Sequence, residues 1–392
     1  PIEDEVILSN LNPKQRINYI SIKSDWQWYS SILKEASITA HLTTDSFSTN
    51  ELQLKLKSKF QISFGSIAIN LDPSISYLNN KFASEYYSNE TSSFASGISK
   101  INLFVSSGAN RFKFKAGAAA VYGFGDDFNE KGLFLLPLLD LSYKPKKGNL
   151  TPFLKLSGDF NQNSFRSFSD ENPFVAPAII LKNTEVPYAV ELGTRTKLVS
   201  GWEFTMNAYY QKANNAPFFR SFGYDNSNEQ FIAFRYGNSF EVIYGELEQF
   251  GFDTSVLAAF KNGGSLSLQA HWRDYSVEET EAWNMPELQF DFKANIKMFN
   301  KIFIQPNIMF IGARKNSYRE RFLVQNPQDA PFMEADLPSF VNAEVKVTYQ
   351  LTDRWELYVK GENIFNAPEF RWVNYQAYGA RFLSGVRYNF DL

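Results

Sequence analysis

The chain has 392 residues, a formal charge of −3 and an aromatic content of 17%, with 38 Phe and 20 Tyr. It is too long for one ordinary soluble core, although a single large barrel can use such a length in one closed sheet. The absence of cysteine excludes disulfides and thiolate metal sites. The slightly acidic balance gives no indication of a nucleic-acid partner. No uncharged apolar run reaches the roughly 18 residues that a membrane-spanning helix needs. Many aromatics without such a run are typical of a transmembrane β-barrel, where only alternate residues meet lipid.

The first residues are the least regular part of the chain. Residues 1–9 are acidic and then apolar, and 16–23 are compatible with a short strand. No secretory signal is visible at the start, so an exported chain is expected in its mature form. We therefore predict an N-terminal periplasmic segment over 1–34, followed by an outer-membrane β-barrel over 35–392.

Alternation of apolar and polar residues then predicts strands along the whole chain. In 52–64, leucines at every second position alternate with Gln and Lys, as in a strand that has one apolar and one polar face. The count is sixteen strands, and fourteen is also compatible. They lie near 38–42, 52–64, 67–71, 98–108, 111–124, 131–144, 150–162, 186–199, 202–213, 240–260, 265–276, 287–299, 301–314, 338–351, 354–366 and 380–391.

The connections between these strands are short and long in turn. The long ones are expected at 79–97, 163–185, 214–239, 277–286, 315–337 and 367–379. Short turns on one rim and long loops on the other are typical of up-and-down outer-membrane barrels with a periplasmic short rim. A soluble all-β sandwich or propeller is the alternative, but soluble strands average about 5–6 residues, fewer than most strands expected here. The prediction is an all-β fold: a transmembrane up-and-down antiparallel barrel of 14–16 strands.

The polar faces of the strands are expected to line the lumen. Their candidate residues are Lys55, Lys57, Lys59, Lys113, Lys115, Arg195, His271, Arg273, Lys293 and Arg387. Carboxylates share these faces, so one interpretation is a network of ion pairs that rigidifies the wall. The other is an excess of positive charge that attracts anions, and we favour the first. His271 has no carboxylate two residues away along its strand, which favours a polar lumen residue over a catalytic one. We expect no catalytic residues, no metal site and no cofactor.

The long loops mix aromatic residues with arginine, a composition typical of binding surfaces. The candidates for ligand binding or partner docking are Phe218, Phe219, Arg220, Phe222, Tyr224, Arg319, Arg371 and Trp372. The apolar stretches 173–181 and 323–324 are expected to fold into the barrel mouth or to dock on another protein. Packing of the loops on one another over the mouth is equally compatible with the sequence.

The C-terminal end carries the most specific pattern. Residues 361–366 read Gly-Glu-Asn-Ile-Phe-Asn, and the last strand is bounded by Gly379 and Phe390. This end resembles that of TonB-dependent outer-membrane receptors, and the hairpin over 186–210 is similar to their mid-barrel hairpin. The matching box consists of Glu362, Asn363, Phe365, Asn366, Tyr388 and Phe390.

The resemblance implies a bacterial outer-membrane protein, not an enzyme, that takes part in substrate binding or passage. Its implied partners are outer-membrane lipids and either a surface lipoprotein or other envelope subunits. Family members carry an N-terminal plug inside a larger barrel, whereas only 1–34 precede the predicted barrel here. The chain is therefore expected to correspond to the barrel portion without the plug. The alternative is a structural subunit of a larger outer-membrane assembly or secretion complex.

Overall fold

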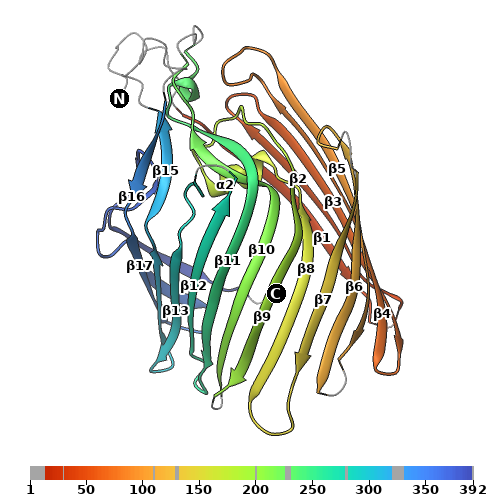
Figure 1. Ribbon diagram of the computed structural model, residues 1–392. Coiled ribbons are helices and arrows are strands. Elements are labelled where there is room, and N and C mark those ends of the chain that lie inside the picture. Colours follow the sequence, from red (N-terminus) through yellow and green to blue (C-terminus); the bar gives the residue numbers. More distant parts are fainter. Residues whose placement is uncertain are drawn as a thin grey trace.

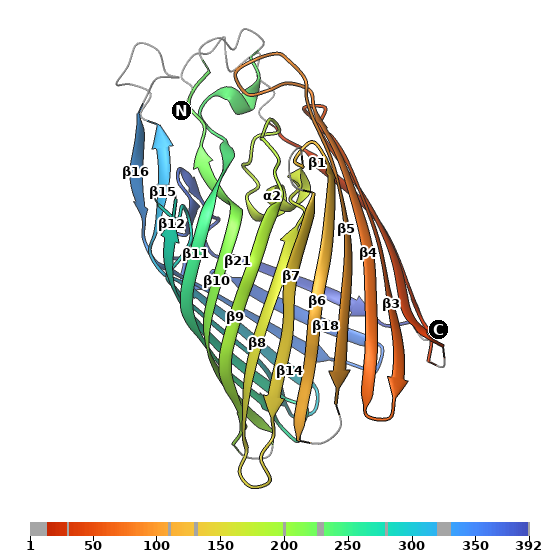
Figure 2. The same cartoon turned by 45° about the vertical axis from the view of Figure 1, so that its right-hand side comes forward.

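The main element of the fold is one antiparallel sheet of seventeen strands, seen from two sides in Figures 1 and 2. The computed structural model describes residues 14–29, 31–108, 111–128, 132–198, 201–225, 231–278, 281–319 and 331–390. The strands of the sheet are β1 (Ile17–Gln27), β2 (Leu33–Asp45), β3 (Asn50–Phe64), β4 (Ile67–Phe82), β5 (Ser92–Ser107), β6 (Phe112–Gly125), β7 (Leu133–Tyr143), β8 (Leu150–Asn161), β9 (Thr184–Lys197), β10 (Trp202–Ser221), β11 (Phe240–Ala259), β12 (Ser265–Val277), β13 (Leu288–Met298), β14 (Ile302–Ile311), β17 (Phe340–Gln350), β18 (Trp355–Glu362) and β21 (Arg381–Tyr388).

Each strand pairs with the next in chain order, which confirms the up-and-down arrangement. The order skips two small hairpins, because β14 pairs with β17 and β18 with β21. These hairpins are β15 (Arg314–Arg319) with β16 (Phe332–Leu337), and β19 (Phe370–Trp372) with β20 (Tyr375–Gln376). Two short helices complete the described elements, α2 (Phe165–Glu171) and the 3₁₀ helix η1 (Ala233–Arg235). None of the helices in the described ranges is long and apolar enough to cross a bilayer.

The strand number corrects the expected 14–16. The additional strand is β1, which lies within residues 1–34 and pairs with β2 along its whole length. Its alternation is short, with Ile20 and Ile22 on one face and Ser21 between them, so the pattern alone did not distinguish it from an irregular segment. The domain boundary at residue 35 stays a prediction. Strand β1 lies before this boundary in the sequence but belongs to the same sheet as the strands after it.

The sheet curves like the wall of a barrel but is not closed. Within the described residues, no pairing joins β1 to β21, so the first and last strands form its two edges. The expected closed sheet is therefore replaced by an open, strongly curved one. Both edge strands run from the long-loop rim to the short-turn rim, as the antiparallel order requires for an odd number of strands.

The two faces of the sheet differ as the alternation predicted. On β3, Leu52, Leu54 and Leu56 are exposed on the outer face, whereas Glu51 and Gln53 are buried on the inner face. Exposed apolar residues recur on the outer face of nearly every strand, for example Ile69, Leu135, Leu192, Phe252 and Val359. Such a continuous apolar outer face is what a lipid-facing wall requires.

The rims also follow the expected pattern, with differences in loop length. Short turns such as 65–66, 299–301 and 351–354 join strands at one rim, and β21 ends there. At the other rim β4 and β5 continue to Phe82 and Ser92, so the loop expected over 79–97 shrinks to 83–91. The loop expected to begin at 214 begins only after Ser221, because β10 continues through a bulge between Ala213 and Ala216.

Candidate functional site

The segment between β8 and β9 lies in the mouth of the curved sheet, at its long-loop rim (Figure 2). It begins with a capped helix: the Ser164 hydroxyl accepts from the Ser167 backbone N–H at 3.0 Å, and the Ser164 N–H donates to the Ser167 hydroxyl at 3.0 Å. This reciprocal capping fixes the first turn of α2. We call residues 162–183 the mouth segment.

A buried carboxylate on the inner wall anchors the mouth segment. Glu51, on the inner face of β3, accepts from the backbone N–H groups of Phe165 at 2.7 Å and Arg166 at 3.0 Å. It also accepts from the Asn80 side chain on β4 at 3.0 Å. Glu51 is only 1% exposed, so these donors satisfy a charge that burial would otherwise make costly. A residue of the wall thereby holds the start of α2.

A second set of polar contacts ties α2 to the first two strands. The Arg166 guanidinium donates to the Ser21 hydroxyl at 3.0 Å and lies 3.1 Å from His41 Nδ1. Its side chain also stacks over the Tyr19 ring, and the Tyr19 hydroxyl contacts Ser169 at 2.8 Å. The mouth segment is therefore attached to β1, β2 and β3 through polar groups.

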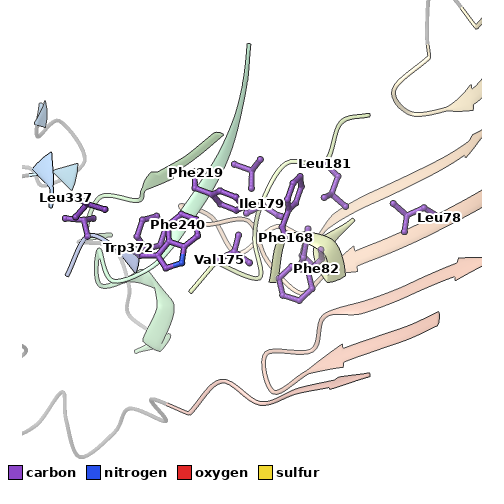
Figure 3. Close-up of a cluster of buried hydrophobic side chains, with 13 residues drawn as sticks. Leu78, Phe82, Phe168, Val175, Ile179, Leu181, Phe219, Phe240, Leu337 and Trp372 are labelled. Carbon is purple, nitrogen blue, oxygen red and sulfur yellow. The ribbon is translucent and has the colours of Figure 1, made fainter. Parts of the chain in front are cut away.

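The remaining side of the mouth segment packs into an apolar cluster, which we call the mouth cluster (Figure 3). It joins side chains from the wall, the mouth segment and the two small hairpins β15–β16 and β19–β20. Its buried members are Leu78, Phe82, Phe165, Phe168, Val175, Ile179, Leu181, Phe219, Phe240, Val242, Leu337, Trp372 and Val373. The apolar stretch 173–181 thus folds into the mouth, which is one of the two arrangements expected for it. The stretch 323–324 lies outside the described residues.

Most of the aromatic residues expected on exposed binding loops are buried in the mouth. Phe218 and Phe219 lie on β10 and not in a loop, because that strand continues past its bulge. Phe219 and Trp372 belong to the mouth cluster. Phe218 packs in a neighbouring cluster with Trp283, and Phe222 stacks on Tyr86 with 3.6 Å between ring centroids. These side chains hold the loops together, so they are not available as a free docking surface in this conformation.

The other candidates of the loop set are partly accessible. Arg220 is also on β10, pairs with Glu241 at 2.8 Å and stacks over Phe332 at 3.9 Å, as Arg319 does. Tyr224 lies 5.5 Å from the ring of Tyr236. Arg371 is exposed and lies 3.9 Å from Glu369, a buried carboxylate whose pKa is raised by burial. Ligand binding or partner docking by this set stays a prediction.

The predicted lumen lysines of β3 meet below the mouth segment, around a cavity of about 430 Å³. Lys55, Lys57 and Lys59 line it together with Lys100 on β5 and Asp159 on β8. Lys59 is 2.6 Å from Glu35, and Lys100 is 2.6 Å from Asp159. Lys100 and Asp159 come from strands that are not adjacent in the sheet, so alternation along one strand gave no signal for their contact.

The other predicted lumen residues are distributed over the inner wall. Lys115 lies 3.9 Å above the Phe104 ring, whereas Lys113 is exposed and does not line the cavity at Lys55 and Lys57. Lys293 lines a separate cavity of about 500 Å³ next to the short turn at Gly201. Arg195 pairs with Glu203 at 3.2 Å, and Arg387 with Glu356 at 3.4 Å. The ion pairs expected along the wall are present.

His271 has a carboxylate partner that the sequence pattern did not reveal. Its Nδ1 lies 2.6 Å from Asp253 on the neighbouring strand β11, in register opposite it. Arg273 pairs with the same carboxylate at 2.7 Å, and Asn207 donates to it at 3.0 Å. Only the register of two strands 18 residues apart brings these groups together. Because Asp253 is shared among three donors, the cluster has the composition of a structural wall network.

The C-terminal box forms a tight turn at the start of the last loop. Asn363 and Asn366 adopt positive φ angles of 44° and 48°, which asparagine tolerates better than most residues. The Asn363 amide donates to the carbonyl of Ala367 at 2.9 Å, and Glu362 pairs with Arg381 on the last strand at 2.6 Å. At the other end Tyr388 packs against Phe390 with 4.7 Å between ring centroids, while Phe365 is exposed. The box therefore shapes and closes the last hairpin.

Across the described ranges, no group of three or more His, Cys, Asp or Glu side chains is arranged to hold a metal ion.

No family model and no curated protein matches the sequence. Solved structures, in contrast, match the fold. The pyoverdine outer membrane receptor FpvA from Pseudomonas aeruginosa PAO1 matches with a TM-score of 0.61 and 10% identity, over 96% of this chain and 62% of that one. The siderophore receptor PirA from Acinetobacter baumannii matches with a TM-score of 0.63 and 11% identity, over 96% and 62%. The FrpB iron transporter from Neisseria meningitidis gives 0.63 and 10%, over 95% and 62%.

The chain thus has the fold of an outer-membrane receptor barrel, and the expected likeness to TonB-dependent receptors is confirmed at the level of the fold. It spans less than two thirds of the length of these proteins. The fold and the apolar outer face together support a place in the bacterial outer membrane.

Proposed function

We propose that this protein lies in the bacterial outer membrane and takes part in the binding or passage of a substrate there. The observation that carries this proposal is the division of its interior. A charged and polar inner wall with a cavity of about 430 Å³ lies beneath a rim at which a segment of the chain packs against the inner face of the sheet. A polar cavity beneath such a segment suits a passage that is gated, because the segment could cover or uncover the cavity.

The mouth segment is the part that would move during passage. It is joined to the sheet at both ends, and side chains hold it through the polar contacts at Glu51 and Arg166 and the apolar contacts of the mouth cluster. A backbone bridge between Val175 and Phe240 of β11 holds its second half. Because the polar contacts lie at the start of the segment, a ligand that replaces them could release α2 without disturbing the sheet. The fold likeness to receptors for pyoverdine and other siderophores supports a binding role at this rim.

Site-directed thiol labelling tests the proposal without background, because the chain contains no cysteine. A cysteine at Ser76, on the inner wall by the cavity, is labelled from the long-loop side in sealed vesicles with a membrane-impermeant maleimide. Slow labelling that becomes at least tenfold faster in Glu51→Ala is expected if the mouth segment gates access. Equal labelling rates in the two backgrounds would contradict a gate at the mouth. A cysteine at exposed Ser93, at the start of β5, serves as the control and should react equally fast in both.

A structural subunit of a larger outer-membrane assembly is the second candidate, and the packing of the mouth cluster favours it. The cluster contains thirteen buried apolar residues, and such packing is also suited to a rigid scaffold. Gentle detergent extraction followed by mass determination separates the two: a lone chain supports passage, and a stable assembly with other envelope proteins supports the scaffold.

A further inference from the structure

We propose that the cavity on the inner wall beneath the mouth segment is a binding site for a phosphate-type oxyanion. This inference rests on the proposed function and specifies its substrate class. The cavity is lined by Lys55, Lys57, Lys59 and Lys100, by Ser74 and Ser76 in register with the first two lysines, and by Asn102 and Gln162. Ammonium, hydroxyl and amide donors converging on one space of this size suit a tetrahedral anion with several acceptor oxygens.

Only two of the four lysines that line the cavity form ion pairs with carboxylates of the described residues. Glu35 engages Lys59 and Asp159 engages Lys100. Within the described residues, neither Lys55 nor Lys57 has an ion-pair partner. Asp72 also lines the cavity, so its four lysines outnumber the two carboxylates among its lining residues. Two lysines therefore remain for a ligand, while the paired ones keep the site positive and ordered.

The position of the two lysines supports binding rather than simple solvation. Lys55 and Lys57 follow one another on the inner face of β3, in register with Ser76 and Ser74 of β4. Each lysine thus has a hydroxyl group on the neighbouring strand, and Ser74 is in turn opposite Lys100 of β5. Three adjacent strands supply donors to the same space, an arrangement that a fixed sheet register holds in place.

The cavity also connects to the mouth segment. Gln162, the residue two before the N-cap of α2, lines the cavity and donates to the Ser96 hydroxyl at 3.1 Å. Lys55 follows Glu51 by four residues on the same face of β3, so the anchor of α2 lies about 13 Å along the strand from the first free lysine. A change in the mouth segment therefore acts directly on the upper border of the site.

The test is calorimetric titration of the full chain in detergent with inorganic phosphate and with glucose 6-phosphate, against a chloride background. The wild type is expected to bind at least one of them saturably. The double variant Lys55→Gln with Lys57→Gln should weaken binding at least tenfold, and Lys55→Arg with Lys57→Arg should retain it. Stronger binding of glucose 6-phosphate assigns the site to a phosphate ester, and stronger binding of phosphate assigns it to the free ion.

The matched control is Lys113→Gln with Lys293→Gln, which removes two charges from the same inner wall outside this cavity. Equal weakening in this control would show a general charge effect and overturn the site, as would wild-type protein without saturable binding. Sucrose flux in vesicles reports on passage separately. Flux without phosphate binding overturns the oxyanion site alone, whereas binding without flux retains the site and contradicts passage.

Discussion

The upper and lower halves of the interior follow different packing rules, although the same strands run through both. On β4 the inner face carries Asn70 and Asp72 towards the short-turn rim, but Leu78 and Phe82 towards the mouth. On β10 the inner-face Asn207 gives way, beyond the bulge, to the buried Phe218, which packs near Trp283 of the loop after β12. The lower half is polar because it faces a cavity, and the upper half is apolar because a returning segment of the chain covers it. The alternation along a strand therefore decides which face a residue occupies. The loops that return to the mouth decide whether that face is covered by apolar side chains or lines a polar cavity.

The largest effect is expected from a substitution in the apolar upper half, within the mouth cluster. Phe165 is fully buried and packs edge-to-face on Phe82, with 5.6 Å between ring centroids. Phe165→Ala should destabilise the mouth segment by about 3–5 kcal/mol, because it leaves a cavity in a closed cluster. Hydrogen exchange of residues 163–181 measures this loss. Phe382→Ala, on an exposed outer-face residue of β21, is the matched control and should leave that exchange unchanged. Unchanged protection in Phe165→Ala would show that the cluster does not hold the segment.

The next prediction compares a substitution on the outer face with one on the polar lower half of the inner face. Leu192 is an exposed outer-face residue in the lower part of β9. Leu192→Arg should lower the free energy of unfolding by about 2–4 kcal/mol, because it places a charge near the midplane of the lipid. Ser157→Arg, on the inner face of β8 two residues from Lys155, should change it by less than about 1 kcal/mol. Denaturant titration in vesicles measures both. Equal costs at the two positions would contradict a lipid-facing outer wall.

The smallest effect concerns the polar anchor where the two halves meet. Glu51→Ala leaves the N–H groups of Phe165 and Arg166 without their acceptor, at an expected cost of about 1–3 kcal/mol. Exchange of these two amides should accelerate while the amides of β3 and β4 stay protected. Glu51→Gln keeps an acceptor oxygen and should show a smaller change. If both variants behave like the wild type, the mouth cluster alone fixes the segment.

The sequence by itself determined the architecture of the wall. Alternation over stretches such as 52–64 gave the strands, their outer and inner faces and the up-and-down order, because a period of two is a local property. It also gave the lysines of the inner wall, since Lys55, Lys57 and Lys59 share a face by parity alone. The C-terminal box pointed correctly to a receptor-like fold. It could be recognised in the sequence because its asparagines form a local turn, and a local turn needs particular residues at fixed spacing.

Only the tertiary structure decided what the loops and the inner wall do. Phe219 and Trp372 are residue types that are common in exposed binding surfaces, and the sequence placed them in loops. They are buried, because segments distant in the chain return to the same mouth. Asp253 meets His271 and Asp159 meets Lys100 through strand register and curvature. Neither can be read from one strand. Pairings of this kind depend on residues far apart in sequence, which a local pattern does not specify. The open edges at β1 and β21 are likewise a property of the whole sheet.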